Sequence, residues 1–413
     1  MAKLLSFVSI ITLLFMFQNI VRAENWPGWR GPSGDGTSSE INLPVKWDST
    51  TNVMWKVPVP GIGYASPIVW GDRLFTITAM TETHEKQLLC YDAKTGNLLW
   101  QVTVIKSPFE SKHSDNSFAS GTPVTDGTSV YVSLLDGDSV VVAAYDFSGK
   151  QLWIKRPGTY SSPHGYSVSP ILYKDKVIIN EDCKGDAFLA ALSRTDGRTL
   201  WKTKFDKRSH SFSTPIIRDI AGKKQMIVCG NMEVASFNPD DGSRNWFATG
   251  PSEDFASSPV YSEQSGLVLI SSGWPKRIIY ALKPDGSGDV TKTHIAWQTA
   301  DGAFYVPSPV TAGAYLITTS INGSVNCIEA ATGKILWKEN LGKQYGSAVL
   351  AGGLVYMPSD QGIITVIKPG ATYEVIAKNN IGETLLASPA ISNGMIYLRS
   401  ANHLFCIGPK GKN

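Results

Sequence analysis

Short hydrophobic runs of about four to eight residues recur along almost the whole chain, separated by turns rich in Gly, Asp and Asn. "SPIVWGDRLFTITA", residues 66–79, has the pattern of two strands about a Gly-Asp turn. "KQLLCYDAKTGNLLW", residues 86–100, has the pattern of two more strands about Lys-Thr-Gly. Val, Ile, Tyr, Leu and Phe fill the runs, as is typical of strands. The pattern predicts an all-β chain.

Two marks repeat with this pattern. Six stretches resemble "YDAKTGNLLW", which ends at Trp100, and five of them carry a Gly four residues before the Trp: Gly96, Gly149, Gly197, Gly242 and Gly333. A Ser-Pro or Thr-Pro pair then opens the next run, at Ser66, Thr122, Ser169, Thr214, Ser258, Ser308 and Ser388, with Ser347-Ala348 in the remaining slot. The spacing of about 39 to 56 residues indicates one structural unit per repeat.

Each repeat holds four strands, which we label A to D, with the Pro at the start of A. Four strands in about 40 to 50 residues is the period of a propeller blade. The chain has eight A and eight D strands, begins with a D strand around Trp55 and ends with the C strand of "HLFCIG". We therefore predict an eight-bladed β-propeller of four-stranded blades over residues 45–409, in which the N-terminal strand around Trp55 completes the last blade.

Seven tryptophans share the D-strand position: Trp55, Trp100, Trp153, Trp201, Trp246, Trp297 and Trp337. A Trp there can pack flat against the neighbouring blade and bury a large apolar surface. The Gly of the preceding turn suits positive φ. The seventh blade has Val375 or Ile376 in place of the Trp, so we expect a weak joint there.

The first 23 residues have the features of an export signal. Lys3 precedes an apolar run, Leu4 to Phe17, and Val21 and Ala23 occupy the small-residue positions before a cleavage site. We predict a signal peptide at 1–23, an N-terminal arm at 24–44, a C-terminal tail at 410–413 and an exported protein, periplasmic or secreted. We expect no transmembrane segment and a monomer. The formal charge of +3 argues against nucleic acid or an anionic membrane as a partner.

The turn "D-A-x-T-G-x-x-x-W" and the Ser-Pro start resemble the pyrroloquinoline-quinone-type propeller repeat over nearly the whole chain. "W-x-x-W-R-G-P", Trp26 to Pro32, and "LP-x-x-W", Leu43 to Trp47, are similar to a group of exported bacterial propellers. That group is described as quinoprotein-like or as similar to the outer-membrane assembly-factor lipoprotein. The resemblance implies the propeller fold and leaves the function open.

Two relatives implied by this resemblance have recognisable requirements. Quinone-dependent alcohol dehydrogenases use adjacent cysteines, a Trp-floored cofactor pocket and acidic calcium ligands, but no two cysteines are adjacent here. The lipoprotein has a lipidated cysteine at its cleavage site, whereas the first cysteine here is Cys90. We predict no cofactor, with pyrroloquinoline quinone and calcium as the alternative.

The five cysteines carry little chemistry. Cys90, Cys327 and Cys406 occupy one C-strand position that other repeats fill with Ala or Ser, which indicates a slot for a small buried side chain. Cys183 and Cys229 end the B strands of successive blades. The sequence does not determine whether these two cysteines form a disulfide.

Two sets of residues are candidates for a binding site. His113, His164 and His210 lie in successive D–A loops, on the face that the B–C loops share. They form either a metal or acid–base site or merely part of a polar loop surface; without a metal-binding spacing we predict no metal. An aromatic residue also precedes strand A in seven blades: Tyr64, Phe118, Tyr166, Phe212, Phe255, Tyr305 and Tyr345. These rings either line the channel mouth and stack on a sugar, quinone or peptide, or pack between the strands.

The Gly-rich stretch "ENWPGWRGPSGDG", residues 24–36, lacks the Lys-Ser/Thr of a phosphate-binding loop. We interpret it as a brace across the propeller near the junction of the first and last blades. Catalytic residues stay unassigned. The sequence favours a non-catalytic exported propeller that binds a partner protein or glycan on the D–A/B–C face. The alternative is a quinone-linked oxidoreductase or a carbohydrate-active enzyme with its site at the channel mouth.

Overall fold

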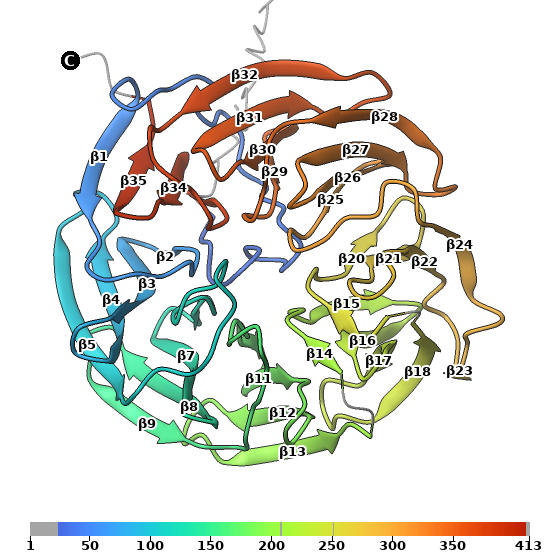
Figure 1. Cartoon of the computed structure of the whole chain (residues 1–413), viewed down its shortest axis with the longest axis horizontal. Coiled ribbons are helices and arrows are strands. Elements are labelled where there is room, and N and C mark those ends of the chain that lie inside the picture. The colour runs from blue at the N-terminus through green and yellow to red at the C-terminus, as the bar shows by residue number, and fades with distance from the viewer. Residues whose placement is uncertain (1–23, 207–208, 251, 410–413) are drawn as a thin grey trace, which may run out of the picture.

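The computed structural model describes residues 24–206, 209–250 and 252–409, whose strands form a ring of radially arranged sheets (Figure 1). The expected signal peptide and C-terminal tail lie outside these residues. Within the described ranges, no helix is long and apolar enough to cross a membrane. The prediction of an eight-bladed, all-β propeller is confirmed. The boundary between arm and propeller at residue 45 stays a prediction.

In seven blades the four antiparallel strands A to D follow one another in chain order, with strand A nearest the axis. The first blade is β2 (Ile68–Trp70), β3 (Arg73–Met80), β4 (Glu85–Asp92) and β5 (Leu98–Lys106), and the second is β6 (Val124–Thr125), β7 (Ser129–Asp136), β8 (Ser139–Asp146) and β9 (Gln151–Lys155). The third blade is β10 (Ile171–Tyr173), β11 (Lys176–Glu181), β12 (Phe188–Ser193) and β13 (Thr199–Lys204). The fourth is β15 (Ile216–Ile220), β16 (Lys223–Gly230), β17 (Glu233–Phe237) and β18 (Arg244–Thr249).

The next three blades continue the same order. They are β20 (Val260–Ser262), β21 (Leu267–Ser271), β22 (Ile279–Leu282) and β24 (Ile295–Thr299); β25 (Val310–Ala312), β26 (Tyr315–Thr319), β27 (Ser324–Glu329) and β28 (Ile335–Asn340); and β29 (Val349–Ala351), β30 (Leu354–Pro358), β31 (Ile363–Lys368) and β32 (Glu374–Asn380). Two short additions pair in parallel: β23 (Gly288–Asp289) with β18, and β14 (His210–Ser211) with β19 (Asp254–Phe255).

The eighth blade joins the two ends of the described chain. β1 (Val53–Pro58) pairs antiparallel with β35 (His403–Ile407), which follows β34 (Met395–Arg399) and β33 (Ala390–Ser392). The predicted closure by the strand around Trp55 is therefore confirmed. The buried Arg399 reinforces it by donating hydrogen bonds to Thr76 Oγ1, at 2.7 Å, and to the carbonyl oxygen of Ile77 in the first blade. A closed ring leaves no unpaired edge between the first and last blades.

The D-strand tryptophans join neighbouring blades. In six blades the indole Nε1 donates to a carbonyl oxygen in the next blade's C–D turn, at 2.9–3.3 Å; the acceptors are Ala93, Phe147, Arg194, Pro239, Ala330 and Gly370. The turn Gly has positive φ and lies under the ring, and a Cβ built on Gly96 would come within 2.8 Å of Trp55. The Gly therefore serves the turn and also makes room for the indole.

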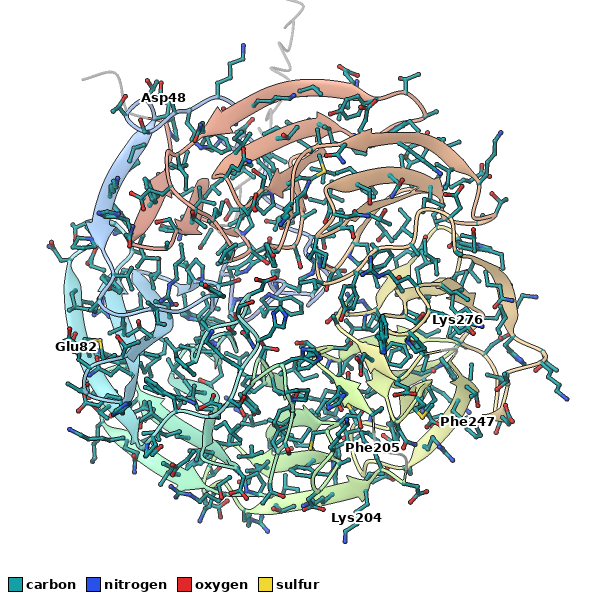
Figure 2. All side chains as sticks on the ribbon, in the orientation of Figure 1. Asp48, Glu82, Lys204, Phe205, Phe247 and Lys276 are labelled. Carbon is teal, nitrogen blue, oxygen red and sulfur yellow. The ribbon has the colours of Figure 1, made fainter. Side chains whose placement is uncertain are left out.

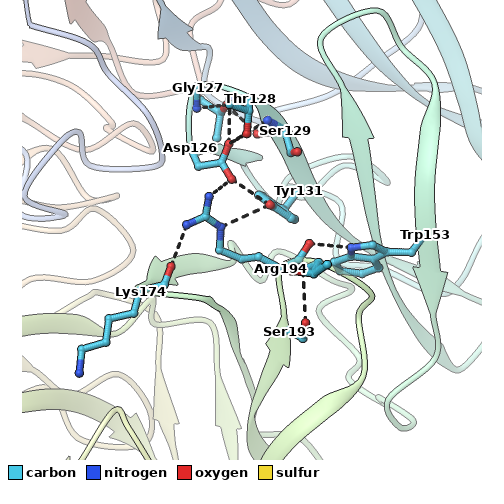
Figure 3. A network of polar contacts seen from close by, with 11 residues as sticks. Asp126, Gly127, Thr128, Ser129, Tyr131, Trp153, Lys174, Ser193 and Arg194 are labelled. Atoms are coloured by element: carbon cyan, nitrogen blue, oxygen red, sulfur yellow. Dashed lines mark hydrogen bonds and ion pairs between the residues drawn. The ribbon is translucent and has the colours of Figure 1, made fainter.

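Figure 3 shows the joint between the second and third blades. Trp153 Nε1 donates to the Arg194 carbonyl oxygen at 2.9 Å, and the Arg194 guanidinium forms an ion pair with Asp126 of the second blade. Tyr131 also donates to Asp126, at 2.9 Å. Backbone and side chain of a single arginine thus link the two blades.

The preference for a small residue at this position of strand C has a structural reason. Cys90, Cys327 and Cys406 pair across the sheet with Trp100, Trp337 and Trp55. A small side chain opposite the indole leaves room for the ring to turn towards the next blade. All five cysteines are free and buried, so Cys183 and Cys229 are not paired.

The weak joint expected at the seventh blade stays a prediction, but the structure shows another tryptophan at this blade, whose indole Nε1 is buried without a hydrogen-bond partner among the described residues. Trp47, which precedes β1, stacks on Tyr356 of β30 with ring centroids 6.3 Å apart. Tyr356 holds the strand position at which Tyr397 contacts Trp55 in the eighth blade. Asn379 fixes the segment by accepting from the Trp47 amide, at 3.0 Å, and donating to the Val45 carbonyl oxygen, at 3.0 Å.

The N-terminal arm crosses the ring on the face of the A–B turns, where Figure 1 shows it as a blue segment reaching the centre. The buried Glu40 carboxylate accepts from the amides of Asn393 and Gly394 in the eighth blade. Arg30, buried near the axis, donates to the carbonyl oxygens of Ala348 and Pro309. The arm therefore braces more blades than the junction of the first and last.

Candidate functional site

A belt of hydroxyl groups surrounds the channel at the start of the A strands. In seven places the backbone amide of the Ser or Thr that opens one blade donates to the hydroxyl oxygen of its counterpart in the next, at 2.8–3.0 Å. The members of this hydroxyl belt are Ser66, Thr122, Ser169, Thr214, Ser258, Ser308, Ser347 and Ser388. The Pro that usually follows has no amide to satisfy, which explains why the Ser-Pro pair recurs.

A cavity of about 390 Å³ opens above this belt at the channel mouth, on the D–A/B–C face. Six belt residues form part of its wall, and Trp29 of the arm borders it. Trp29 also borders a second cavity on the arm side of the channel. The indole therefore lies between the two cavities and floors the upper one, so we refer to the upper one as the mouth cavity.

The structure brings part of the predicted aromatic set to this cavity. Tyr64, Phe212, Tyr305 and Tyr345 line it, all half-buried. The other three pack elsewhere: Phe118 stacks on Phe109 at 4.2 Å between ring centroids, and Tyr166 and Phe255 are buried. The stripe is therefore divided between rings at the channel mouth and rings packed in the blades. Contact of any ring with a ligand stays a prediction.

The three histidines form a continuous row at the rim. The ring centroids of His113 and His164 are 5.9 Å apart, and those of His164 and His210 are 6.1 Å apart. His113 and His164 line the mouth cavity, whereas His210 is buried behind them with Nδ1 3.1 Å from Asp254 Oδ1. Burial lowers the pKa of His164, and the neighbouring imidazoles lower it further. Among the described residues no group of three or more His, Cys, Asp or Glu could hold a metal ion.

The wall of the mouth cavity is largely apolar, is interrupted by hydroxyl, amide and imidazole groups, and contains little charge. Its lining includes one carboxylate, that of Asp115, and no Lys or Arg. Asp115 accepts a hydrogen bond from the Tyr345 hydroxyl at 2.9 Å. The Asn116 side chain donates to the His164 carbonyl oxygen at 2.7 Å and so ties neighbouring loops together.

Two buried carboxyl groups lie behind this wall in the third blade. Tyr166, between Ser133 and Glu181, donates to Glu181 Oε1 at 2.8 Å. Burial raises the pKa of Glu181 to about 8. Burial also raises the pKa of Asp182, to about 6, although Asp182 accepts bonds from Ser209 and the Asn231 amide.

An exposed tryptophan marks the same face beside the cavity. Trp274, in the B–C loop of the fifth blade, is 65% exposed. Its carbonyl oxygen accepts from the amides of Glu253 and Asp254, at 2.8 and 3.2 Å. Arg277 of the same loop lies over the Tyr305 ring, 4.6 Å from its centroid. The loop is thus attached to the cavity rim, and Figure 2 labels its exposed Lys276 on the fifth blade.

Sequence reasoning missed three contributions to this site. The sequence places Trp29 only within the brace at residues 24–36, because nothing in the arm reveals that it reaches the channel axis. The hydroxyl belt was interpreted only as the start of strand A. The sequence alone could have indicated Trp274, because it is a tryptophan outside the repeat position in a polar B–C loop.

Solved structures of quinone enzymes share the fold. Quinohemoprotein alcohol dehydrogenase from Comamonas testosteroni aligns with a TM-score of 0.65 and 11% identity, covering 94% of this chain and 81% of that one. A europium-containing methanol dehydrogenase aligns with a TM-score of 0.56 and 12% identity, covering 92% and 90%. At such identities the likeness establishes the fold alone.

The mouth cavity does not fit the cofactor that these enzymes suggest. Pyrroloquinoline quinone is a tricarboxylate, and calcium takes six to eight oxygen ligands, many from carboxylates. The lining offers no basic side chain and a single carboxylate. Trp29 borders the cavity as a tryptophan does at the floor of such sites. The other lining side chains could not hold the carboxylates of the quinone or the calcium ion. We therefore propose no quinone-linked reaction at this cavity.

Assembly-factor proteins are similar to this chain in sequence as well as in structure. A family model described as outer membrane protein assembly factor BamB matches residues 84–339 and 275–407. BamB from Yersinia pestis is 23% identical over 313 residues, which are 75% of this chain and 66% of that protein. The BamB structure from Moraxella catarrhalis aligns with a TM-score of 0.62 and 14% identity, covering 87% and 98%. The chain belongs to the PQQ-like β-propeller repeat family represented by outer membrane protein assembly factor BamB.

Proposed function

We propose that this chain is an exported, non-catalytic binding protein that presents its D–A/B–C face to a partner protein. The observation that carries the proposal is Trp274, a large apolar side chain that is 65% exposed on a loop held by backbone hydrogen bonds. Tryptophan is enriched among the residues that dominate the binding energy of protein interfaces. A fixed loop also loses little conformational entropy on binding.

The family supports a protein partner. Its members include a protein named as an assembly factor for outer membrane proteins. The 23% identity does not carry a particular partner over to this chain. A periplasmic or secreted location agrees with the expected signal peptide and stays part of the proposal.

The enzymatic alternatives have less support from the geometry. A glycoside hydrolase usually needs two carboxyl groups flanking the scissile bond, and Asp115 is the one carboxylate among the residues that line the mouth cavity. Glu181 and Asp182 are buried in the third blade. A quinone-linked reaction would need a cofactor that the lining does not fit.

Site-specific photo-crosslinking in cells of the source organism tests the proposed face. A photoreactive amino acid replaces Trp274 in one variant and Leu152 in the other. Leu152 is a matched control, because it is also a large apolar residue, 47% exposed, but lies on the outer strand β9. We expect discrete crosslinked protein bands from position 274 and none of these bands from position 152.

The opposite outcome has a clear meaning. If position 274 gives no protein adduct while the variant is exported and folded, the partner face lies elsewhere. Identical adducts from both positions would indicate nonspecific contact and would also overturn the proposal.

A further inference from the structure

We infer that the mouth cavity binds the terminal unit of a neutral glycan. This inference goes beyond the partner surface around Trp274, because it assigns a separate small-ligand site to the channel axis. It rests on the charge, hydrogen-bonding groups, aromatic faces and shape of the cavity.

The charge of the wall selects against ionic ligands. No Lys or Arg lines the cavity, and its one carboxylate is already engaged by Tyr345. A multiply charged anion would lose its hydration without gaining a counter-charge, which is costly in a confined site. The wall therefore favours an uncharged ligand.

The hydroxyl belt supplies donors around the channel. In the hydrogen bonds described above, the belt oxygens accept from backbone amides, and among the described residues their own O–H groups donate no hydrogen bond within the protein. Each hydroxyl carries one donor hydrogen, so the six belt residues in the wall have donors available to a ligand. Asn116 and the two imidazoles add polar groups at the rim. Such a circle of groups suits a ligand with hydroxyls around its own ring.

Aromatic rings supply the apolar surfaces. Tyr64, Tyr305, Tyr345 and Phe212 surround the opening, and Trp29 floors it. The faces of a sugar ring carry C–H groups that can pack on such rings, while its edge carries the hydroxyls. A peptide side chain has at most a few polar atoms and would leave most belt donors unpaired, which is unfavourable in a desolvated site.

The shape restricts the ligand to a chain end. Trp29 borders both the mouth cavity and the cavity on the arm side, and the arm reaches the channel axis (Figure 1), so a glycan that enters from the mouth meets the arm. A volume of about 390 Å³ is in the lower part of the range for small-ligand pockets. One or two sugar units would fill it, with the rest of the glycan pointing away from the face.

Saccharide titration of the purified full chain tests this inference. The probes are four neutral disaccharides, namely maltose, cellobiose, chitobiose and xylobiose, and the hexamer of each series. Tryptophan fluorescence and saturation-transfer NMR detect their binding. We expect at least one series to bind, with dimer and hexamer affinities equal within about threefold, because units beyond the cavity make few contacts. A groove open at both ends would instead show affinity rising with length.

Variants connect binding to the cavity. Phe212→Ala and, separately, Tyr345→Ala should weaken binding about fivefold to tenfold, as expected for removing an aromatic contact, and Trp29→Phe should change the fluorescence response. Leu152→Ala, on the outer strand β9, is the control and should leave saccharide affinity unchanged. Melting temperatures verify that each variant is folded.

Three results would overturn the inference: no binding of any series at millimolar concentration, unchanged binding in folded Phe212→Ala and Tyr345→Ala, or a partner peptide that occupies the cavity and displaces the saccharide. Each is distinguishable from failure of the partner-face proposal, which depends on crosslinks at position 274.

Discussion

At the scale of single residues, burial determines the behaviour of the charged groups behind the cavity. Glu181 is fully buried, and only Oε1 has a hydrogen-bond partner, Tyr166. Burial raises the pKa of Glu181 more than the Tyr166 hydrogen bond and the charge of Lys202 lower it, because the charged form would lose its hydration. The third blade therefore contains a neutral acid close to the rim.

Replacing Glu181 by Gln tests this protonation state. The pKa of Glu181 is raised from 4.5 to about 8 in the folded protein, so the folded state keeps a proton that the unfolded chain releases. Stability contributed by this group is therefore lost as the pH rises from about 4.5 to about 8. We expect the melting temperature of the native protein to fall more steeply across this window than that of Glu181→Gln. Parallel pH profiles for the two proteins would contradict a buried neutral acid.

At the scale of elements, six joints between blades share one arrangement, an indole together with the residues that accommodate it. Gly in the C–D turn, a small residue on strand C and a carbonyl acceptor recur together around the ring. The seventh blade shows that the indole can come from outside the repeat. Trp47 reaches the same position from the segment that precedes β1.

Trp47→Ala should therefore destabilise the propeller as much as loss of a D-strand tryptophan. We expect the free energy of unfolding to fall by about 3–5 kcal/mol, the usual cost of truncating a buried Trp, and Trp100→Ala to cost a similar amount. Chemical denaturation measures both, with Leu152→Ala as the exposed control. A change below about 1 kcal/mol in Trp47→Ala would mean that the seventh joint does not depend on this residue.

At the scale of the whole molecule, the sequence predicts those features of the fold that follow from the repeat. Strand order, blade number and closure at Trp55 follow from motifs that recur in nearly every blade. The motifs recur because each blade must pack in the same way against its neighbours. Trp29, Trp47 and Trp274 lie outside the repeat, and no spacing rule places them. The mouth cavity depends on the path of the arm through the channel, which only tertiary packing determines.

The arm also makes the two faces of the molecule different. On one face it crosses to the channel axis and is held by Arg30 and Glu40. The other face keeps the mouth cavity, the histidine row and Trp274. We predict that the partner meets only this second face.

Thiol accessibility in living cells tests that claim most directly, since the native cysteines are at most 2% exposed and give little background. Lys276→Cys places a thiol beside Trp274, and Lys94→Cys places one in a C–D turn on the opposite face; both positions are exposed. We predict that a maleimide labels Lys276→Cys slowly in cells and rapidly after purification, and labels Lys94→Cys equally in both. Equal labelling of Lys276→Cys in cells and after purification, with protection at Lys94→Cys, would contradict the account.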